Sequence, residues 1–276
     1  MVVTYHIWFG RVSGGVDVFL LISAFLLSLI PGPTQISADW GELESACSGE
    51  DEPGSAVLDG HCRVTAPDNP ARTILVIGDS HAQQWLGAVE PMAGESNYKV
   101  VSLLMGACSF GIESEGRSQG CNDFNAAAMA YALEHDVDAV ITVASAASKD
   151  STEERIVDGL PAAARELTRH GIVVVGVRDN PRYPFNMYAC SQSEGASACA
   201  TDRSLKLASE APFNWPGGVP DGVGFVDMSD LICPAGVCPP VIGNVNVYMD
   251  TNHLTATYAG SMSDEFSARF HAVSGW

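Results

Sequence analysis

The sequence predicts an α/β fold, a three-layer α/β/α sandwich built around a mainly parallel sheet. Short apolar runs typical of buried strands recur at 73–77, 138–144 and 172–177. Stretches of helical pattern separate these runs, and strands that alternate with helices indicate a parallel sheet covered on both faces. A chain of 276 residues with 46% hydrophobic content is large enough to bury such a core. We therefore expect one core domain.

The first segment, 1–35, differs in composition from the rest of the chain. Residues 16–30 are nearly all apolar and run into Pro31. A bilayer span takes ~20 residues, so this run is marginal unless it begins near residue 12. A signal peptide and a buried core helix are the alternatives, and the signal peptide is disfavoured because Arg11 is the only basic residue before the run. We predict a hydrophobic membrane segment that places the following chain outside the cytoplasm.

Residues 36–72 are polar and rich in Glu, Asp and Pro. We predict that they form a linker and lead-in, clamped by Cys47 and Cys62, to a core domain at 73–276.

From residue 73 onward the expected elements follow in steady order. An alanine-rich run favours the helix at 122–135, and acidic residues in the first turn, with Gly171 as the cap, favour the helix at 152–170. We predict that residues 180–224 form a long loop with one short helix near 205–209. The expected strands lie at 73–77, 99–105, 138–144 and 172–177. We expect a strand and turn at 225–231 and a short final strand, or an approach to the last helix, at 245–249. The main helices are expected at 82–94, 122–135, 152–170 and 253–270.

Eight cysteines fall into four pairs that are close in sequence, and each pair brackets a segment rich in Gly, Ser, Pro or Asn. Local disulfides staple such irregular segments in exported proteins, although the sequence alone does not fix the pairing. A zinc site would need Cys-x2-Cys knuckles that converge with histidine, and the sequence has none. The pairs that we expect are Cys47 with Cys62, Cys108 with Cys121, Cys190 with Cys199, and Cys233 with Cys238.

The charge balance is strongly acidic. Only 14 Lys and Arg residues oppose 33 Asp and Glu residues, which gives a formal net charge of −19. A chain of this charge is repelled by phosphate backbones and by anionic lipid surfaces. We therefore exclude nucleic acid as a partner and read the acidity as that of a solvated surface.

The chemistry-bearing residues are Ser80, at the end of the first core strand, and Asp250 with His253, before the last helix. A serine hydroxyl needs a base within hydrogen-bond reach and a third group to orient that base. His253 is the candidate base, and Asp250 lies three residues before it. At a strand-to-helix turn the Ser80 amide also faces outward, where it can donate to a developing oxyanion.

A metal site is the competing interpretation of the same stretches. Asp79, His81, Asp250 and His253 include metal-ligand types, but the further Asp and Asn-His-Glu motifs of metallophosphoesterases are absent. We therefore expect neither a metal nor another cofactor. We expect Asp79 to bond loop amides and His81 to shape the turn.

The motif at 78–81, Gly-Asp-Ser-His, with Asp250-x-x-His253, resembles the SGNH hydrolase superfamily, whose fold is flavodoxin-like. It is most similar to the extracytoplasmic SGNH domain fused to acyltransferase-3 proteins. The resemblance implies Ser80 as nucleophile, His253 as base and Asp250 as orienting residue. Gly106 matches the glycine whose amide completes the oxyanion hole in that family.

One family position departs from the pattern. The superfamily places an asparagine after the next strand, whereas this chain has Val143-Ala144-Ser145-Ala146-Ala147-Ser148 there. Ser145 or Ser148 is then the candidate third oxyanion donor. Loss of one such donor costs roughly 10² to 10³ in rate, so a slow or acceptor-selective enzyme is the expectation.

The N-terminal segment carries a second resemblance. Tyr5-His6 with the run at 13–26 is similar to the first transmembrane helix of the acyltransferase-3 family, in which the histidine is implicated in handling the acyl donor. The other membrane helices of that family have no counterpart here. We therefore expect 1–35 to be a truncated remnant of that helix, without a catalytic role for His6.

Together the two resemblances imply a membrane-anchored chain whose SGNH domain lies in the cell envelope. The implied reaction is serine-dependent O-acyl transfer, chiefly of acetyl groups, or ester hydrolysis. The implied partners are an acyl donor and a glycan or glycolipid acceptor. The alternative is a catalytically weak glycan-binding or scaffolding module of a membrane acyltransferase.

Overall fold

A computed structural model gives the structure of the chain and describes residues 32–112, 114 and 116–276. The chain divides into two compact units, 1–38 and 39–276. The described part of the first unit holds one short helix, α3 (Pro33–Ser37), with Pro33 in its first turn. All other described elements belong to the second unit.

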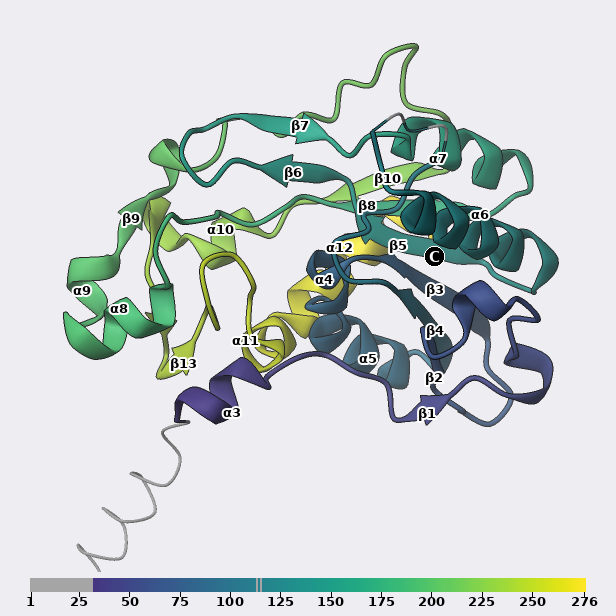
Figure 1. Ribbon diagram of the computed structural model, residues 1–276, viewed down its shortest axis with the longest axis horizontal. Coiled ribbons are helices and arrows are strands. Elements are labelled where there is room, and N and C mark those ends of the chain that lie inside the picture. The colour runs from purple at the N-terminus through teal and green to yellow at the C-terminus, as the bar shows by residue number, and fades with distance from the viewer. Residues whose placement is uncertain (1–31, 113, 115) are drawn as a thin grey trace, which may run out of the picture. The chain divides into compact units, whose positions relative to one another are not determined.

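A seven-stranded sheet forms the middle of the second unit (Figure 1). Its order is β1-β2-β4-β3-β5-β8-β10. Neighbouring strands from β4 to β10 are parallel, and β2 pairs antiparallel with both β1 and β4. This confirms the mainly parallel sheet. In sheet order the strands are Ser45–Ala46, Cys62–Val64, Tyr98–Leu104, Arg72–Gly78, Ala139–Val143, Val173–Val177 and Val223–Val226.

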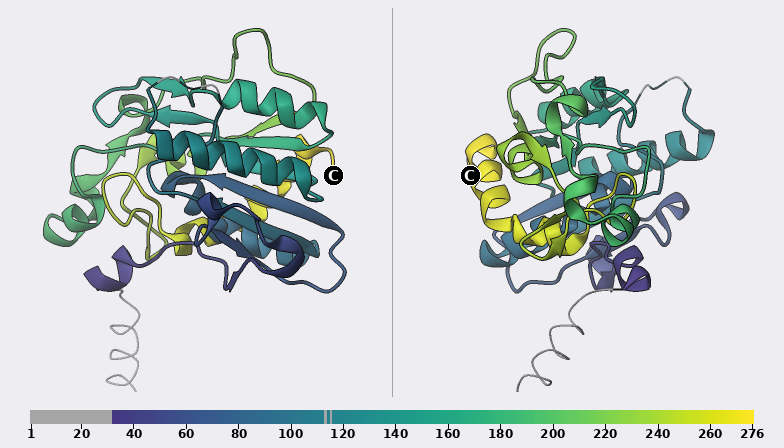
Figure 2. Two further views of the ribbon diagram at one scale, coloured as in Figure 1. Left: turned by 45° about the vertical axis from the view of Figure 1, so that its right-hand side comes forward. Right: turned by 90° about the vertical axis from the view of Figure 1, so that its left-hand side faces the viewer.

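Helices cover both faces of the sheet and complete the three layers (Figure 2). Ile74 and Val76 of β3 belong to the core cluster that includes residues of α5 (Leu86–Glu95), α11 (Ala256–Ser261) and α12 (Ser263–Ser274). Leu75 and Ile77 belong to the opposite cluster, with α6 (Gln119–Glu134) and α7 (Leu160–Arg169). Successive side chains of a strand point to opposite faces, so one apolar run serves both cores.

The prediction for 152–170 is wrong in its first half. Residues there form β7 (Glu154–Ile156), which pairs antiparallel with β6 (Ser145–Ala147), and α7 begins only at Leu160. Glu154 forms a buried ion pair with Arg178. A buried guanidinium requires a carboxylate partner, so this tertiary contact overrides the acidic helix-start pattern. Gly159, at φ +72, then turns the chain into α7.

Other boundaries also differ from the predicted ones. The helix at 82–94 divides into α4 (Ser80–Gln83) and α5, and the helix at 253–270 begins only at Ala256, because Thr255 is its N-cap. The strand and turn expected at 225–231 are the end of β10, at Val226, and a short helix, α10 (Ser229–Ile232), in place of the turn. The strand expected at 245–249 is reduced to β13 (Val245–Asn246), which pairs with β12 (Val241–Ile242) outside the main sheet.

The long excursion at 180–224 is more ordered than predicted. It contains α8 (Met187–Ser193), α9 (Ala196–Cys199) and β9 (Thr201–Asp202), which pairs with β11 (Val237–Cys238). The short helix expected near 205–209 is instead a 3₁₀ turn at Arg203–Leu205. Elements this short carry too little periodicity to predict. The four expected disulfides all form.

The lead-in at 36–72 also contributes to the fold, since β1 and β2 form one edge of the sheet and Leu43 and Leu58 are fully buried. The expected membrane segment falls, for residues 1–31, outside the described residues, and so does His6. In the described part of the chain, no helix has both the length and the apolar character that a membrane crossing requires.

Candidate active site

Ser80 lies at the turn between β3 and α4. Gly78 ends the strand at φ +149, and a Cβ there would lie 2.9 Å from the Ala82 Cβ, so both the conformation and the space require glycine. Asp79 is the N-cap of α4, where its carboxylate accepts a hydrogen bond from the His81 amide. The turn therefore presents Ser80 at the carboxyl end of a central strand, the edge at which open α/β sheets bind ligands.

The structure brings Ser80, His253 and Asp250 into one chain of contacts. The Ser80 Oγ lies 2.8 Å from His253 Nε2, and His253 Nδ1 lies 2.7 Å from Asp250 Oδ2. Both separations are within hydrogen-bond range. The three side chains are therefore arranged as a nucleophile, a base and an orienting carboxylate would be.

Asp250 is also held by the backbone of its own turn. Its Oδ1 accepts hydrogen bonds from the amides of Asn252 and His253, each at 2.8 Å. Burial alone would raise the pKa of Asp250, but the hydrogen bonds from the His253 side chain and from the two amides outweigh it and lower that pKa. The carboxylate therefore stays ionised beside the imidazole.

A second histidine–aspartate pair lies next to the first. His81 Nδ1 lies 2.9 Å from Asp179 Oδ1, and His81 Nε2 lies 2.9 Å from Asn252 Nδ2. The Nδ1 contact is at ion-pair distance from the Asp179 carboxylate, and an Nε2 that accepts fits the Asn252 amide, which donates. The rings of His81 and His253 are 4.8 Å apart at their centroids. His81 thus joins the turn that carries Ser80 to the loop that carries His253.

Asp179 is fully buried and surrounded by donors. Its carboxylate accepts hydrogen bonds from the Ala147 amide, at 2.8 Å, and from Arg182 Nε, at 2.7 Å. Burial by itself raises the pKa of Asp179, but His81, Arg182 and the Ala147 amide together lower it to about 2. Asp179 is therefore a permanent anion that fixes the orientation of His81.

Gln84 and Asn180 hold the His253 loop in place through hydrogen bonds to its backbone. Gln84 Nε2 donates to Asn180 Oδ1 at 2.7 Å, and Gln84 Oε1 accepts the Leu254 amide at 2.8 Å. Asn180 Nδ2 donates to the Asn252 carbonyl at 2.7 Å. Gln84 and Asn180 are both fully buried. The loop is thereby attached to α4 and to the segment after β8.

The lead-in closes the site on another side. The ring of Trp40 packs edge-on against His253, with 4.8 Å between centroids. Asp39 accepts hydrogen bonds from the amides of Ala256 and Thr257 in the first turn of α11. A Cβ at Gly41 would lie 2.7 Å from the Leu86 Cβ, so glycine allows this close passage over α5. These residues were not expected at the site.

The two remaining expected site residues lie beyond the neighbouring strands. Gly106 follows β4 and is exposed, with open space where a Cβ would be. Ser145 is the first residue of β6, after β5, and its buried Oγ accepts a hydrogen bond from the Asp179 amide at 2.9 Å. Ser145 is therefore enclosed by the protein, whereas Gly106 borders open space.

Sequence reasoning missed the polar residues that support the pair of histidines: Gln84, Asp179, Asn180, Arg182 and Asn252. A signal was available for the middle three, because they directly follow β8 at the same sheet edge as Ser80. Two aromatic residues near the motifs, Trp85 and Tyr248, are buried in the core and do not line the site. Among the described residues, no group of three or more His, Cys, Asp or Glu side chains has the arrangement of a metal site.

Comparison with known proteins adds two findings. Residues 46–268 match the sequence family described as "SGNH domain (fused to AT3 domains)". A structural relative is the periplasmic domain of a lipopolysaccharide acetyltransferase from Salmonella ser. Paratyphi A, with a TM-score of 0.51 and 13% sequence identity over 74% of this chain and 85% of that chain. At this identity the structural likeness speaks for the fold alone.

No curated protein matches the chain. The family match nevertheless covers most of its length and spans both the Ser80 turn and the His253 loop. The chain belongs to the family of SGNH domains that are fused to AT3 domains.

Proposed function

We propose that the chain is a serine-dependent O-acyltransferase or acylesterase that acts on acyl groups, chiefly acetyl, of cell-surface glycans or glycolipids. The observation that carries the proposal is the contact chain from the Ser80 Oγ to His253 Nε2, at 2.8 Å, and from His253 Nδ1 to Asp250 Oδ2, at 2.7 Å. That order of groups is what converts a neutral hydroxyl into a nucleophile.

The reaction passes through an acyl-serine intermediate. The Ser80 Oγ forms a bond to the ester carbonyl carbon while His253 Nε2 takes the hydroxyl proton, and His253 then returns that proton to the departing alcohol. In the second half a water or a sugar hydroxyl attacks the acyl carbon, gives its proton to His253, and the Ser80 Oγ leaves and regains a proton. Asp250 keeps Nδ1 of His253 protonated throughout.

The oxyanion that forms in each half needs donors aimed at the carbonyl oxygen. We assign the backbone amides of Ser80 and Gly106 to this role, because β4, which precedes Gly106, lies beside β3, which precedes Ser80. Ser145 is the third candidate, but it is buried, and its Oγ is held in place by the hydrogen bond that it accepts from the Asp179 amide. We therefore expect its contribution to the rate to be small.

We further propose that the domain works outside the cytoplasm. Four disulfides close within the described chain, and disulfides persist in oxidising compartments. The structural relative is likewise a periplasmic domain. The proposed partners are an acyl donor and a glycan or glycolipid acceptor, with the membrane reached through the N-terminal segment. The net charge of −19 makes nucleic acid an unsuitable partner.

The test is labelling with a fluorophosphonate together with hydrolysis of 4-nitrophenyl acetate. We expect the wild-type protein to react with both and the Ser80→Ala variant to react with neither. Ser96→Ala is a matched control, since Ser96 lies between α5 and β4 at the opposite edge of the sheet. A wild-type protein that neither labels nor hydrolyses the ester would refute the proposal and favour a glycan-binding module.

A further inference from the structure

A polar cavity of about 430 Å³ lies beside the site just described and takes no part in it. One wall follows β4 and includes Ala107 and Ser109, while the other follows β5 and includes Arg155 of β7 and Asp158. Strands β4 and β5 flank β3 in the sheet. The two walls of the cavity therefore follow the two neighbours of the strand that carries Ser80.

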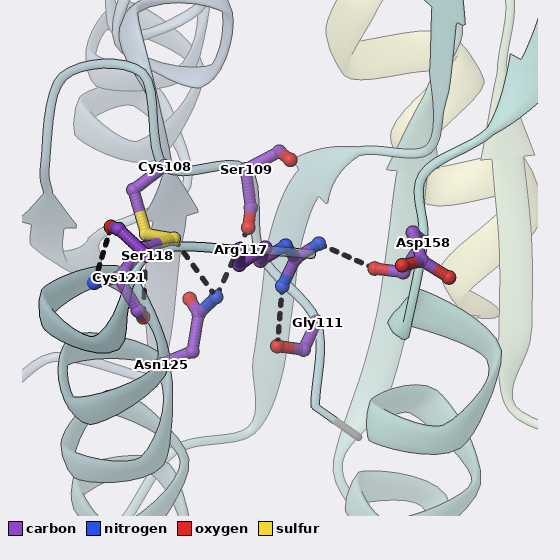
Figure 3. The surroundings of a disulfide bond; sticks show 8 residues. All are labelled: Cys108, Ser109, Gly111, Arg117, Ser118, Cys121, Asn125 and Asp158. Atoms are coloured by element: carbon purple, nitrogen blue, oxygen red, sulfur yellow. Dashed lines mark hydrogen bonds between the residues drawn. A yellow bond between two sulfur atoms is a disulfide. The ribbon is translucent and has the colours of Figure 1, made fainter. Parts of the chain in front are cut away.

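Two arginines give this cavity, here called the arginine pocket, its charge. Arg117 is half-buried and donates to the carbonyls of Gly111, at 2.7 Å, and of Asp158 (Figure 3). Arg155 is exposed, and its side chain makes no hydrogen bond or ion pair with any other residue that the structure describes. Arg155 follows Glu154 on β7, and successive side chains of a strand point to opposite faces. Glu154 points inward to its buried partner Arg178, so Arg155 points away from that ion pair.

Further features favour an anion in the arginine pocket. The 16-residue helix α6 begins at its edge, with Ser118 as the N-cap, and the amino end of a helix carries a partial positive charge. Among the described lining residues, Asp158 carries the carboxylate, and this group already accepts a hydrogen bond from Ser114. In a chain of net charge −19, the described lining of this cavity has two arginines and one carboxylate, so its local charge is opposite in sign to that of the chain.

The pocket is electrostatically connected to the Ser80 turn. Burial lowers the pKa of Arg117, Arg155 lowers it further, and Asp158 and Asp79 act in the opposite direction. Asp79 immediately precedes Ser80, so Arg117 and the nucleophile turn lie within range of each other's charges. A guanidinium remains protonated in proteins despite such shifts.

The pocket is also built before any ligand arrives. The Cys108–Cys121 disulfide ties the segment after β4 to the first turn of α6, and Asn125 Nδ2 donates to the Ser109 carbonyl at 3.1 Å (Figure 3). A Cβ at Gly111 would lie 2.3 Å from the Asp158 carbonyl, which shows how closely the two walls meet. A preformed site loses less free energy to ordering when it binds.

We propose that the arginine pocket binds an anionic group, a carboxylate or a phosphate ester, of the glycan whose acyl group is transferred at Ser80. The substrate class rests on the proposed function, and the anion site rests on the pocket itself. Guanidinium groups bind both kinds of oxyanion through paired hydrogen bonds. Arg155 is the decisive residue, because Arg117 also bridges two backbone segments and a change there would disturb the walls.

The experiment measures binding rather than turnover, in the Ser80→Ala protein. Methyl glucuronide and glucose 6-phosphate are the anionic probes, methyl glucoside is the neutral one, and ligand-observed NMR gives the dissociation constants. We expect at least one anionic probe to bind about tenfold more tightly than the glucoside. The stronger of the two identifies the anion as carboxylate or phosphate. Added salt should reduce the preference.

Arg155→Gln should remove most of this preference, and Arg155→Lys should keep more of it. Arg169→Gln, the same charge change on the exposed end of α7 at the other sheet edge, should leave the preference intact. Equal binding of all three probes, or a preference that Arg155→Gln does not alter, overturns the inference. A wild-type protein that neither reacts with the fluorophosphonate nor hydrolyses 4-nitrophenyl acetate refutes only the proposed function, because the binding result does not depend on turnover.

Discussion

Two histidine–aspartate pairs flank Ser80, and they differ in exposure and in what each histidine contacts. The side chains of His253 and Asp250 are 17% and 35% exposed, whereas those of His81 and Asp179 are 5% and 0% exposed. The second ring nitrogen of His253 faces the Ser80 hydroxyl, and that of His81 faces the Asn252 amide. One pair can reach a substrate, while the other is closed within the protein.

Because the two pairs differ in exposure and in their contacts, a histidine–aspartate contact alone does not identify a catalytic base. A base must exchange a proton with the reacting group and therefore needs an accessible nitrogen. His81 has both nitrogens occupied by protein groups, and its effect on the reaction passes through Asn252 to the loop of His253. We therefore treat His81 as a positioning residue.

The largest expected effect separates the two histidines. His253→Ala should lower kcat for 4-nitrophenyl acetate by roughly 10⁴ to 10⁶, as loss of the base does in a serine triad. His81→Ala should cost about 10- to 100-fold, because it only loosens the Asn252 contact, and we expect His81→Gln to restore part of the loss. Equal losses for the two alanine variants would remove the distinction between the pairs.

The next largest expected effect on activity concerns Asp250, the carboxylate of the more exposed pair. Asp250→Asn should lower kcat by roughly 10² to 10⁴, because an amide cannot stabilise the imidazolium that forms during the reaction. The fluorophosphonate labelling rate should fall in parallel, since it reports the nucleophilicity of Ser80. If labelling by the Asp250→Asn protein matched the wild-type rate, Asp250 would have no orienting role.

Replacing Asp179 should change the free energy of unfolding of the protein rather than the rate of fluorophosphonate labelling. Its pKa is lowered from 3.8 to about 2 in the fold, so the ionised carboxylate stabilises the protein above pH 4, and this contribution is lost as the pH falls toward 2. The loss amounts to about 2 kcal/mol. We expect Asp179→Asn to be less stable at pH 6 and to show a flatter decline in acid.

Urea unfolding at a series of pH values between 6 and 2 measures this decline. Asp136→Asn is the control, with the same charge change at an exposed position. An Asp179→Asn protein whose stability falls with acid as steeply as that of the control would contradict the assignment of the lowered pKa to the buried pair.

The smallest expected effect concerns Ser145, which supports the buried pair through the Asp179 amide. Ser145→Ala should lower kcat by less than about tenfold. Loss of a true oxyanion donor costs roughly 10² to 10³. A loss of that larger size would instead make Ser145 the third donor of the exposed pair's reaction.

The exposed pair was predictable from the sequence, and the buried pair was not. Ser80 ends an apolar strand and Asp250 precedes His253 by one turn, so local pattern and spacing point to them. Asp179 and His81 have no such local relation, because their contact is created by the order in which the strands pair. Their partner Asn252 is distant from both in sequence.

The secondary structure also divides into elements that were predictable from the sequence and elements that were not. The parallel strands were predictable because each is a continuous apolar run. The β6–β7 hairpin was not, because the buried ion pair of Glu154 with Arg178 decides its conformation against the helix-like pattern of its sequence. Tertiary electrostatics therefore set the parts of the structure that local pattern misjudged.

The packing of Trp40 on His253 has a practical consequence for where the domain can be cut. The family match begins at residue 46, yet Asp39 accepts hydrogen bonds from the first amides of α11 and Trp40 packs against His253. A recombinant fragment that starts at 46 would retain Ser80, Asp250 and His253 but lose both of these supports. The functional boundary of the domain therefore lies before Asp39, upstream of the boundary that sequence similarity marks.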